Sequence, residues 1–167
     1  MTTVRPATPN DADAIGRIQV ESWRVAYAGL LPVETIAAFD VEARQQLWRD
    51  GLARAPRPGS ATFVATVDDE QIGFATVGAS YSEDSIGELY AIYVHPSRWG
   101  RGAGRALIEQ SELSLRDSGF PSALLWVLDG NERAERFYRS AGWQRDGEKE
   151  DVFQGADVVE LRYRKQL

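Results

Sequence analysis

The sequence predicts an α/β fold of the α+β kind: a single domain over residues 1–167, with a mixed, mostly antiparallel sheet of six to seven strands and helices on both faces. Three observations support this fold. A chain of 167 residues that is 43% hydrophobic can bury one core but is short for two. Its hydrophobic period changes from helical to strand-like near residue 60. The predicted elements follow the order β, α, α, β, β, β, α, β, α, β, β.

The first third of the chain is expected to be mainly helical. After a short strand at residues 2–7, Asn10 is placed to cap a helix that runs to about residue 27. Residues 33–53 carry a second helical pattern, which we expect to form one or two short helices. The stretch 54–60 contains two prolines and a glycine and is therefore expected to be a loop.

The rest of the chain supplies most of the sheet and two more helices. Apolar runs rich in β-forming residues predict the strands, and apolar residues three to four positions apart predict the helices. In the first of these helices, Leu113 is expected on the apolar arc and Glu112 on the opposite one. The expected strands are 61–67, 71–78, 88–95, 123–128, 143–146 and 157–163, and the expected helices are 101–118 and 131–141.

Charge and composition exclude several kinds of function. With 25 acidic and 19 basic residues the net charge is −6, so the overall field repels nucleic acid and anionic membranes and favours a cationic amine substrate. The chain has no cysteine and one histidine, which excludes disulfides, thiol nucleophiles and zinc sites built from these residues; no metal is expected. The sequence shows neither a membrane span nor a leader pattern, so we expect a cytoplasmic location.

The turn after the strand at 88–95 is the strongest functional feature. It holds three glycines, Gly100, Gly102 and Gly104. Glycines at a helix start let backbone N–H groups approach a ligand, and the helix N-terminus adds partial positive charge, so together they form an anion site. Three arginines accompany them with no acid in between, Arg98, Arg101 and Arg105. This charge pattern favours a bound phosphate over a turn that is merely tight.

Two other phosphate-binding motifs fail on spacing. A dinucleotide fingerprint G-x-G-x-x-G would need glycine where Arg105 or Leu107 stands. A P-loop would need a lysine after the glycines, and none follows. Neither a Rossmann dinucleotide site nor a P-loop is therefore expected.

The motifs around the turn resemble those of the GNAT superfamily of N-acetyltransferases. A strand, V-x-P and a glycine turn that opens a helix are similar to the acetyl-CoA motif of that superfamily, although Trp99 stands where the family usually has Gln or Arg. A second motif of the family, N-x-x-A-x-x-F-Y-x-x-x-G-F/W, is matched at every spacing by Asn131, Ala134, Phe137, Tyr138, Gly142 and Trp143.

The resemblance implies how acetyl-CoA would bind. The cofactor would lie where the strand ending at Val94 splays from the strand 123–128, and its pantetheine amides would pair with backbone groups of Ile92, Tyr93 and Val94. Its pyrophosphate would meet the amides of Gly100, Arg101, Gly102, Ala103, Gly104 and Arg105. Asn131 would touch the pantetheine arm, although its place at a helix start also suits an N-cap.

The resemblance also implies the chemistry: acetyl transfer to a primary amine of a small molecule or peptide, directly within a ternary complex. Glu88 matches the general base of some members, but it could also be a solvated strand-end carboxylate. Tyr138 matches a tyrosine near the coenzyme sulfur, where a hydrogen bond to the leaving sulfur suits it better than full proton transfer; it could equally be a packed core residue. A backbone N–H near Val94 would polarise the carbonyl.

The acceptor side is open in the sequence. Aromatic residues that could line its pocket, or merely pack the core, are Trp23, Tyr27, Trp48 and Tyr81. His95, beside a proline at a strand end, suits turn packing more than catalysis. A non-catalytic acyl-CoA-binding regulatory module is the alternative function, and it would be favoured by a solvated Glu88 and a core-buried Tyr138. The family also implies that a homodimer can form.

Overall fold

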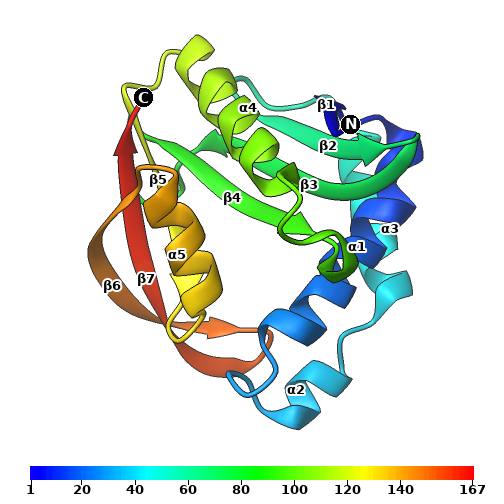
Figure 1. Cartoon of the computed structure of the whole chain (residues 1–167). Helices are drawn as coiled ribbons and strands as arrows, with labels where there is room; N and C mark the ends of the chain where they lie inside the picture. Colours follow the sequence, from blue (N-terminus) through cyan, green and yellow to red (C-terminus); the bar gives the residue numbers. More distant parts are fainter.

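A computed structural model describes residues 1–167 and shows one seven-stranded sheet in the order β1-β2-β3-β4-β5-β7-β6 (Figure 1). All neighbouring strands are antiparallel except β4 and β5. The predicted mixed, mostly antiparallel fold is therefore confirmed. The strands are β1 (Thr3–Pro6), β2 (Ala61–Val67), β3 (Glu70–Ala79), β4 (Gly87–Val94), β5 (Ser122–Leu128), β6 (Gln144–Phe153) and β7 (Ala156–Gln166). The helices are η1 (Pro9–Asp11), α1 (Ala12–Ala26), α2 (Val33–Ala37), α3 (Val41–Leu52), η2 (Pro96–Arg98), α4 (Ala103–Asp117) and α5 (Glu132–Ser140).

Helices cover both faces of the sheet because side chains alternate along each strand. On β3, Ala75 points into the main core, which α4 and α5 cover, whereas its neighbour Phe74 packs against Ile15 and Ile18 of α1 on the opposite face. Figure 1 shows α4 and α5 on one side of the sheet and α1 with α3 on the other. No helix combines the length and apolar character needed to cross a bilayer.

The parallel contact between β4 and β5 is very short. Only Gly87 with Ala123 and Glu88 with Leu124 are in register, after which the strands diverge (Figure 1). The register between β3 and β4 also shifts, because Thr76 faces Ala91 while Val77 faces Leu89. Tyr90 is thus an extra residue in β4, and a bulge of this kind bends the strand that carries it. The sheet is therefore open beyond residue 88 of β4.

The start of α1 differs from the prediction. Asn10 does not cap the helix: η1 begins after Thr8, and the Asp11 side chain accepts hydrogen bonds from the backbone N–H of Thr8 at 2.7 Å and from Arg5 at 2.8 Å. The guanidinium of Arg5 holds the pKa of Asp11 well below its ordinary value. The helical segment therefore begins at Pro9, one residue before Asn10, and the Asp11 carboxylate ties its first turn to Thr8 and Arg5 instead of capping α1.

The buried arc of α4 also differs from the prediction. Leu113 is 47% exposed, whereas Glu112 is buried. The reason is the helical turn of about 100° per residue. Viewed down the axis of α4, the buried residues Ala103, Leu107 and Leu115 span an arc of about 120° that starts at Ala103. Leu113, ten positions after Ala103, lies at about 280° and therefore on the opposite side. Glu112 lies at the margin of the arc and is tolerated there because it has partners.

Strands β6 and β7 are longer than the sequence suggested. The hydrophobic pattern predicts strands only over residues 143–146 and 157–163. In the structure the two strands pair over Gln144–Phe153 and Ala156–Gln166. Their charged side chains form cross-strand ion pairs instead of burying apolar surface, among them Lys149 with Glu160 at 3.3 Å. A hydrophobic pattern could not reveal a hairpin held in this way.

Glu112 supports the first testable prediction. Its carboxylate accepts from Trp143 Nε1 at 2.9 Å and from Lys165 Nζ at 2.7 Å. Glu112→Ala would leave the buried indole N–H of Trp143 without a partner and would leave Lys165 with the Ala141 carbonyl but no carboxylate, so we expect the free energy of unfolding to fall by about 3 kcal/mol in urea denaturation. The control Glu109→Ala removes an exposed carboxylate of the same helix and should cost less than about 0.5 kcal/mol. Equal losses would show that the Glu112 contacts contribute nothing.

Candidate active site

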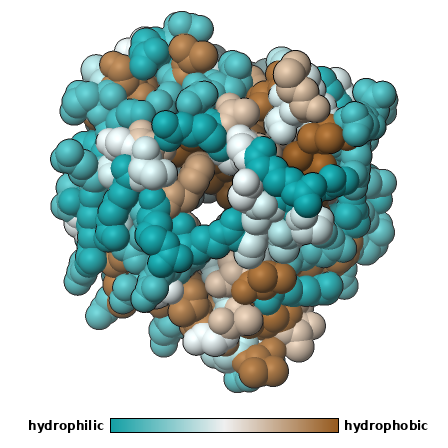
Figure 2. All heavy atoms as spheres, viewed as in Figure 1, coloured by the Kyte–Doolittle hydropathy of each residue, from teal (hydrophilic) through white to brown (hydrophobic).

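A cavity of about 910 Å³ lies where β4 and β5 part. It is lined from β4, β5, the N-terminus of α4, α5, the end of α1 and the β6–β7 hairpin. Figure 2 shows a hollow near the middle of this face, with mostly hydrophilic residues around its mouth and hydrophobic residues inside. Its volume is at the upper end of the range for small-molecule sites. A long ligand with an apolar middle and polar ends would suit it.

The backbone of β4 offers unpaired groups to this cavity. His95 N donates to Ile72 O of β3 at 2.8 Å, and because N–H groups alternate along a strand, Ile92 and Val94 direct theirs away from β3, into the opening. The backbone of Tyr93 faces β3 instead, so the predicted pantetheine pairing fits Ile92 and Val94 but not the Tyr93 backbone. Tyr93 lines the cavity with its side chain.

The glycine turn closes the end of the cavity at the start of α4. Gly100 and Gly102 have φ values of 73° and 86°, a left-handed conformation that suits glycine, and Gly102 is the N-cap residue of α4. A Cβ atom at either position would meet no protein atom within 4 Å. Glycine is thus required there by the backbone conformation and not by crowding within the chain.

The arginines of the turn are less free than the sequence suggested. Arg98 pairs with Glu70 of β3, and Arg105 pairs with Glu109 at 2.9 Å. Arg101 does not line the main cavity; it borders a separate hollow of about 220 Å³ on the other side of the turn. At this end of the cavity an anion would therefore meet the backbone amides and the N-terminus of α4 more than a free arginine.

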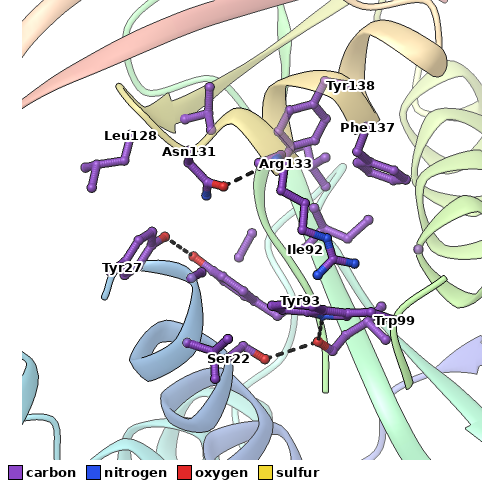
Figure 3. Close-up of a pocket in the computed structure, with 18 of the residues that line it drawn as sticks. Ser22, Tyr27, Ile92, Tyr93, Trp99, Leu128, Asn131, Arg133, Phe137 and Tyr138 are labelled. Carbon is purple, nitrogen blue, oxygen red and sulfur yellow. Dashed lines mark hydrogen bonds between the residues drawn. The ribbon is translucent and has the colours of Figure 1, made fainter. Parts of the chain in front are cut away.

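Trp99 has a defined place that the sequence did not reveal. Its Nε1 donates to Val94 O at 2.7 Å, and Ser22 Oγ donates to the same carbonyl at 3.3 Å. The guanidinium of Arg133, from α5, stacks on the Trp99 ring at 3.3 Å from its centroid, so that these side chains meet across the cavity (Figure 3). Trp99 thus links β4, the turn and α5.

Helix α5 supplies Asn131 and Tyr138. The Asn131 side chain accepts from Ala134 N at 3.2 Å, which makes it the N-cap of α5, and it also lines the cavity (Figure 3). Tyr138 belongs both to the main core and to the cavity wall. Burial raises its pKa, and the nearby Tyr93 adds to this shift. Its phenol therefore stays protonated at neutral pH and can donate a hydrogen bond.

Glu88 lines the cavity at the point where β4 and β5 still touch. It is only 9% exposed and accepts from Tyr81 N at 3.2 Å. Burial raises its pKa, and the positive charge of Lys149 offsets part of the rise. The alternative of a solvated strand-end carboxylate is therefore wrong.

An ion-pair network fixes the loop that holds Glu88. Glu83 of the β3–β4 loop accepts from Arg162 at 2.9 Å and from Arg164 at 2.7 Å, and both arginines, on β7, also bind Asp146. The side chains of this network are about one quarter to one third exposed, so it is more than a surface contact. It holds the loop against the sheet, and Tyr81 N with it.

Of the four aromatic pocket candidates, only Tyr27 lines the cavity, and its hydroxyl bonds that of Tyr93 at 2.9 Å (Figure 3). Trp23 is 4% exposed and lies in an aromatic cluster with Phe39 and Phe153. Tyr81 is 70% exposed and lies beside Tyr90, because it belongs to the loop that follows the end of β3 and not to the strand itself. Trp48 packs on Phe74 under α3 and bonds Gln19.

The sequence missed much of the opposite wall. The residues in question are Trp126 of β5, Lys149 and Phe153 of β6, and Glu160 of β7. The position of Trp126 could have been predicted, because side chains alternate along a strand and those of its neighbours Leu125 and Val127 point into the main core on the other face of the sheet. The other three come from the charged hairpin that the hydrophobic pattern underestimated.

His95 lies outside the main cavity and bonds Glu21 at 2.8 Å and Ser97 at 2.7 Å, as expected for turn packing.

Sequence comparisons agree with this geometry. The model of the Acetyltransferase (GNAT) family matches residues 18–143. An uncharacterized N-acetyltransferase of Bacillus subtilis, YuaI, is 31% identical over 164 residues, covering 96% of this chain and 91% of that protein. A mycothiol acetyltransferase of Thermomonospora curvata is 36% identical over 113 residues, covering 65% of this chain but only 37% of that protein.

Solved structures show the same fold. The PaiA N-acetyltransferase from Thermoplasma acidophilum, in complex with coenzyme A, superposes with a TM-score of 0.77 at 21% identity and covers 100% of this chain and 99% of its own. YncA from Salmonella typhimurium, a putative acetyltransferase solved with acetyl-CoA, has a TM-score of 0.74 at 21% identity. The match covers 99% of this chain and 93% of the YncA chain. Together with the family match, these findings show that the chain belongs to the GNAT family and is an N-acetyltransferase that uses acetyl-CoA.

Proposed function

We propose that the protein transfers the acetyl group of acetyl-CoA directly to a primary amine of a small molecule or peptide, within a ternary complex. The observation that carries this proposal is the single cavity that contains both the glycine turn of α4 and the buried carboxylate of Glu88. Donor and acceptor can therefore occupy one continuous space, and neither an intermediate carrier nor a second site is needed. Bound acetyl-CoA would supply the activated thioester.

The residues at the cofactor end fit such a ligand. The free N–H groups of Ile92 and Val94 can pair with amides of a pantetheine arm, as an added strand would, and the Asn131 side chain lies beside them. The amides of Gly100, Arg101, Gly102, Ala103, Gly104 and Arg105 begin α4 and are proposed to bind the pyrophosphate. The C=O of Val94 is engaged by Trp99 and Ser22, but its N–H is free, so one of the N–H groups of Ile92 and Val94 can polarise the thioester carbonyl while the other pairs with the pantetheine arm.

Glu88 is proposed to accept the proton of the amine, directly or through water. A primary ammonium with a pKa of about 10.4 costs roughly 4 to 5 kcal/mol to deprotonate at neutral pH, so a base at this point is useful. Burial makes Glu88 a stronger base than an exposed glutamate, and Tyr81 N keeps its carboxylate in place. Tyr138 is proposed to donate a hydrogen bond to the departing sulfur.

The alternative of a non-catalytic acyl-CoA-binding module rested on a solvated Glu88 and a Tyr138 confined to the core. The first condition fails because Glu88 is buried, whereas Tyr138 is buried in the main core but also lines the cavity, where a ligand could meet it. Incubating the protein with acetyl-CoA and a panel of primary amines while following free thiol release tests the proposal. Amine-dependent thiol release is expected; binding of acetyl-CoA without turnover of any amine would favour the module instead.

Gly102→Val tests the cradle. A β-branched side chain is strained at this φ and would project toward the bound pyrophosphate, so we expect the Kd for coenzyme A to rise about tenfold or more in isothermal titration. Gly119, at the other end of α4, has a similar φ of 89° and equally open surroundings. Gly119→Val should therefore lower stability in the same way while leaving Kd unchanged. A normal Kd for Gly102→Val would refute the cradle assignment.

Tyr138→Phe removes the proposed donor to sulfur. We expect kcat to fall by about tenfold or more, with near-normal affinity for coenzyme A, because the lost hydrogen bond acts mainly in the transition state. Tyr163→Phe is a matched control, since Tyr163 is fully buried but bonds only Glu135 and does not line the cavity. It should reduce stability without reducing kcat. Unchanged turnover in Tyr138→Phe would remove this residue from the mechanism.

Glu88→Gln tests the base through pH. With wild-type protein, kcat/KM should rise as pH passes upward through the raised pKa of Glu88, because the ionised form is the base. In the glutamine variant the increase due to Glu88 should disappear, so that only the pH dependence caused by deprotonation of the amine substrate remains. Its kcat/KM should be lower by about 10².

Stability gives the control for Glu88→Gln. Because burial raises the pKa of Glu88 in the folded state, its contribution to stability falls as pH rises through that pKa. The variant should consequently resist urea at least as well as wild type at neutral pH. A pH profile identical to wild type would exclude Glu88 as the base.

A further inference from the structure

Lys149 occupies a cation site at the acceptor end of the cavity. Its Nζ lies 4.4 Å from the centroid of the Trp126 ring, 2.6 Å from Asp151 Oδ2 and 3.3 Å from Glu160 Oε2. An aromatic face together with two carboxylates is a complete site for an ammonium group. The chain fills this site with its own side chain.

The same site belongs to the wall where the acceptor would lie. Lys149, Trp126 and Glu160 line the cavity together with Glu88. Burial raises the pKa of Glu88, and the positive charge of Lys149 lowers it in part. Burial also raises the pKa of Tyr27, and the negative charge of Glu160 raises it further. The charged groups therefore form one electrostatic unit that extends from the proposed base to Tyr27.

The charge balance favours an acceptor with a single positive group. Glu160 and Asp151 are already paired with Lys149, so an acceptor carboxylate would meet a lysine that two carboxylates contact, and Glu88 is left to face the positive group of the acceptor. A second ammonium on the acceptor would meet the charge of Lys149 itself. The remaining wall is apolar, with Leu30 and Phe153, and suits a hydrocarbon body.

We propose that Lys149 determines acceptor specificity by filling the site that a second ammonium of the substrate would otherwise take. The acceptor is accordingly a monoamine with an apolar body, and α,ω-diamines are disfavoured. This inference rests on the proposed acetyl transfer to primary amines.

A matched series of acceptors tests the inference. For each chain length from about three to six carbons, the n-alkylamine, the α,ω-diamine and the ω-amino acid are compared by kcat/KM with acetyl-CoA as donor. The proteins are wild type, Lys149→Met, Lys149→Gln as a second neutral variant, Lys149→Arg, and Arg145→Met. Arg145→Met removes one positive charge from the same strand, outside the cavity, and serves as the control for net charge.

Wild type should prefer the alkylamine. In Lys149→Met or Lys149→Gln the diamine-to-alkylamine ratio of kcat/KM should rise about tenfold, because the second ammonium can now bind between Trp126 and Glu160. Lys149→Arg and Arg145→Met should keep the wild-type ratio. Adding Glu160→Gln to Lys149→Met should cancel the gain. Titration with coenzyme A checks that each variant retains its cofactor site.

Three results would overturn the inference. An unchanged diamine ratio in both neutral variants would show that Lys149 does not exclude a second ammonium. A rise in Arg145→Met as large as in Lys149→Met would assign the effect to net charge alone. A wild-type preference for the ω-amino acid that disappears in Lys149→Met would mean that Lys149 binds an acceptor carboxylate. Absence of turnover with every amine in every protein would instead contradict the proposed function.

Discussion

The brevity of the β4–β5 contact is the constraint on which the rest of the structure depends. Two residue pairs join the strands, and beyond them the amides of Ile92 and Val94 face a cavity instead of a neighbouring strand. Buried backbone groups without partners cost free energy, so an open sheet of this kind is stable only where water or a ligand can bind them. The divergence therefore creates the cavity and leaves backbone groups that an extended ligand with amide groups would satisfy.

The fixed parts of the molecule lie on both sides of this opening. On one side, Trp99 holds the Val94 carbonyl and stacks under Arg133, which connects the turn to α5. On the other, Glu83 ties the β3–β4 loop to Arg162 and Arg164, and so fixes the loop whose N–H binds Glu88. Side-chain contacts thus hold both sides of the opening in addition to the sheet ladder, which ends at Glu88. This explains how the strands can part without loosening the groups proposed to act in catalysis.

The sequence predicted most of the helices, the strands in their order along the chain and the glycine turn that opens α4, because these depend on local patterns. The glycine turn and the motif from Asn131 to Trp143 are contiguous, and their spacing is itself the information. Sequence-based prediction failed where the burial of a residue or the start of a helix depended on partners distant in the chain. Glu112 is buried because Trp143 and Lys165 reach it, and the helical segment begins before Asn10, where Asp11 binds Arg5 and Thr8 N. Neither contact can be read from periodicity.

The same distinction explains why the acceptor end was poorly predicted. In the proposed function the donor would be recognised largely by backbone amides, which any sequence with the right glycines can present. The acceptor would be met by side chains of Glu88, Trp126 and Lys149, which lie on three strands and come together only through the register of β5, β7 and β6. The order of the strands along the chain can be inferred from patterns, but which charged residue opposes which depends on the register and on the bulges at Tyr90 and Asp146. The proposed acceptor end therefore lies in the part of the fold that hydrophobic periodicity describes least.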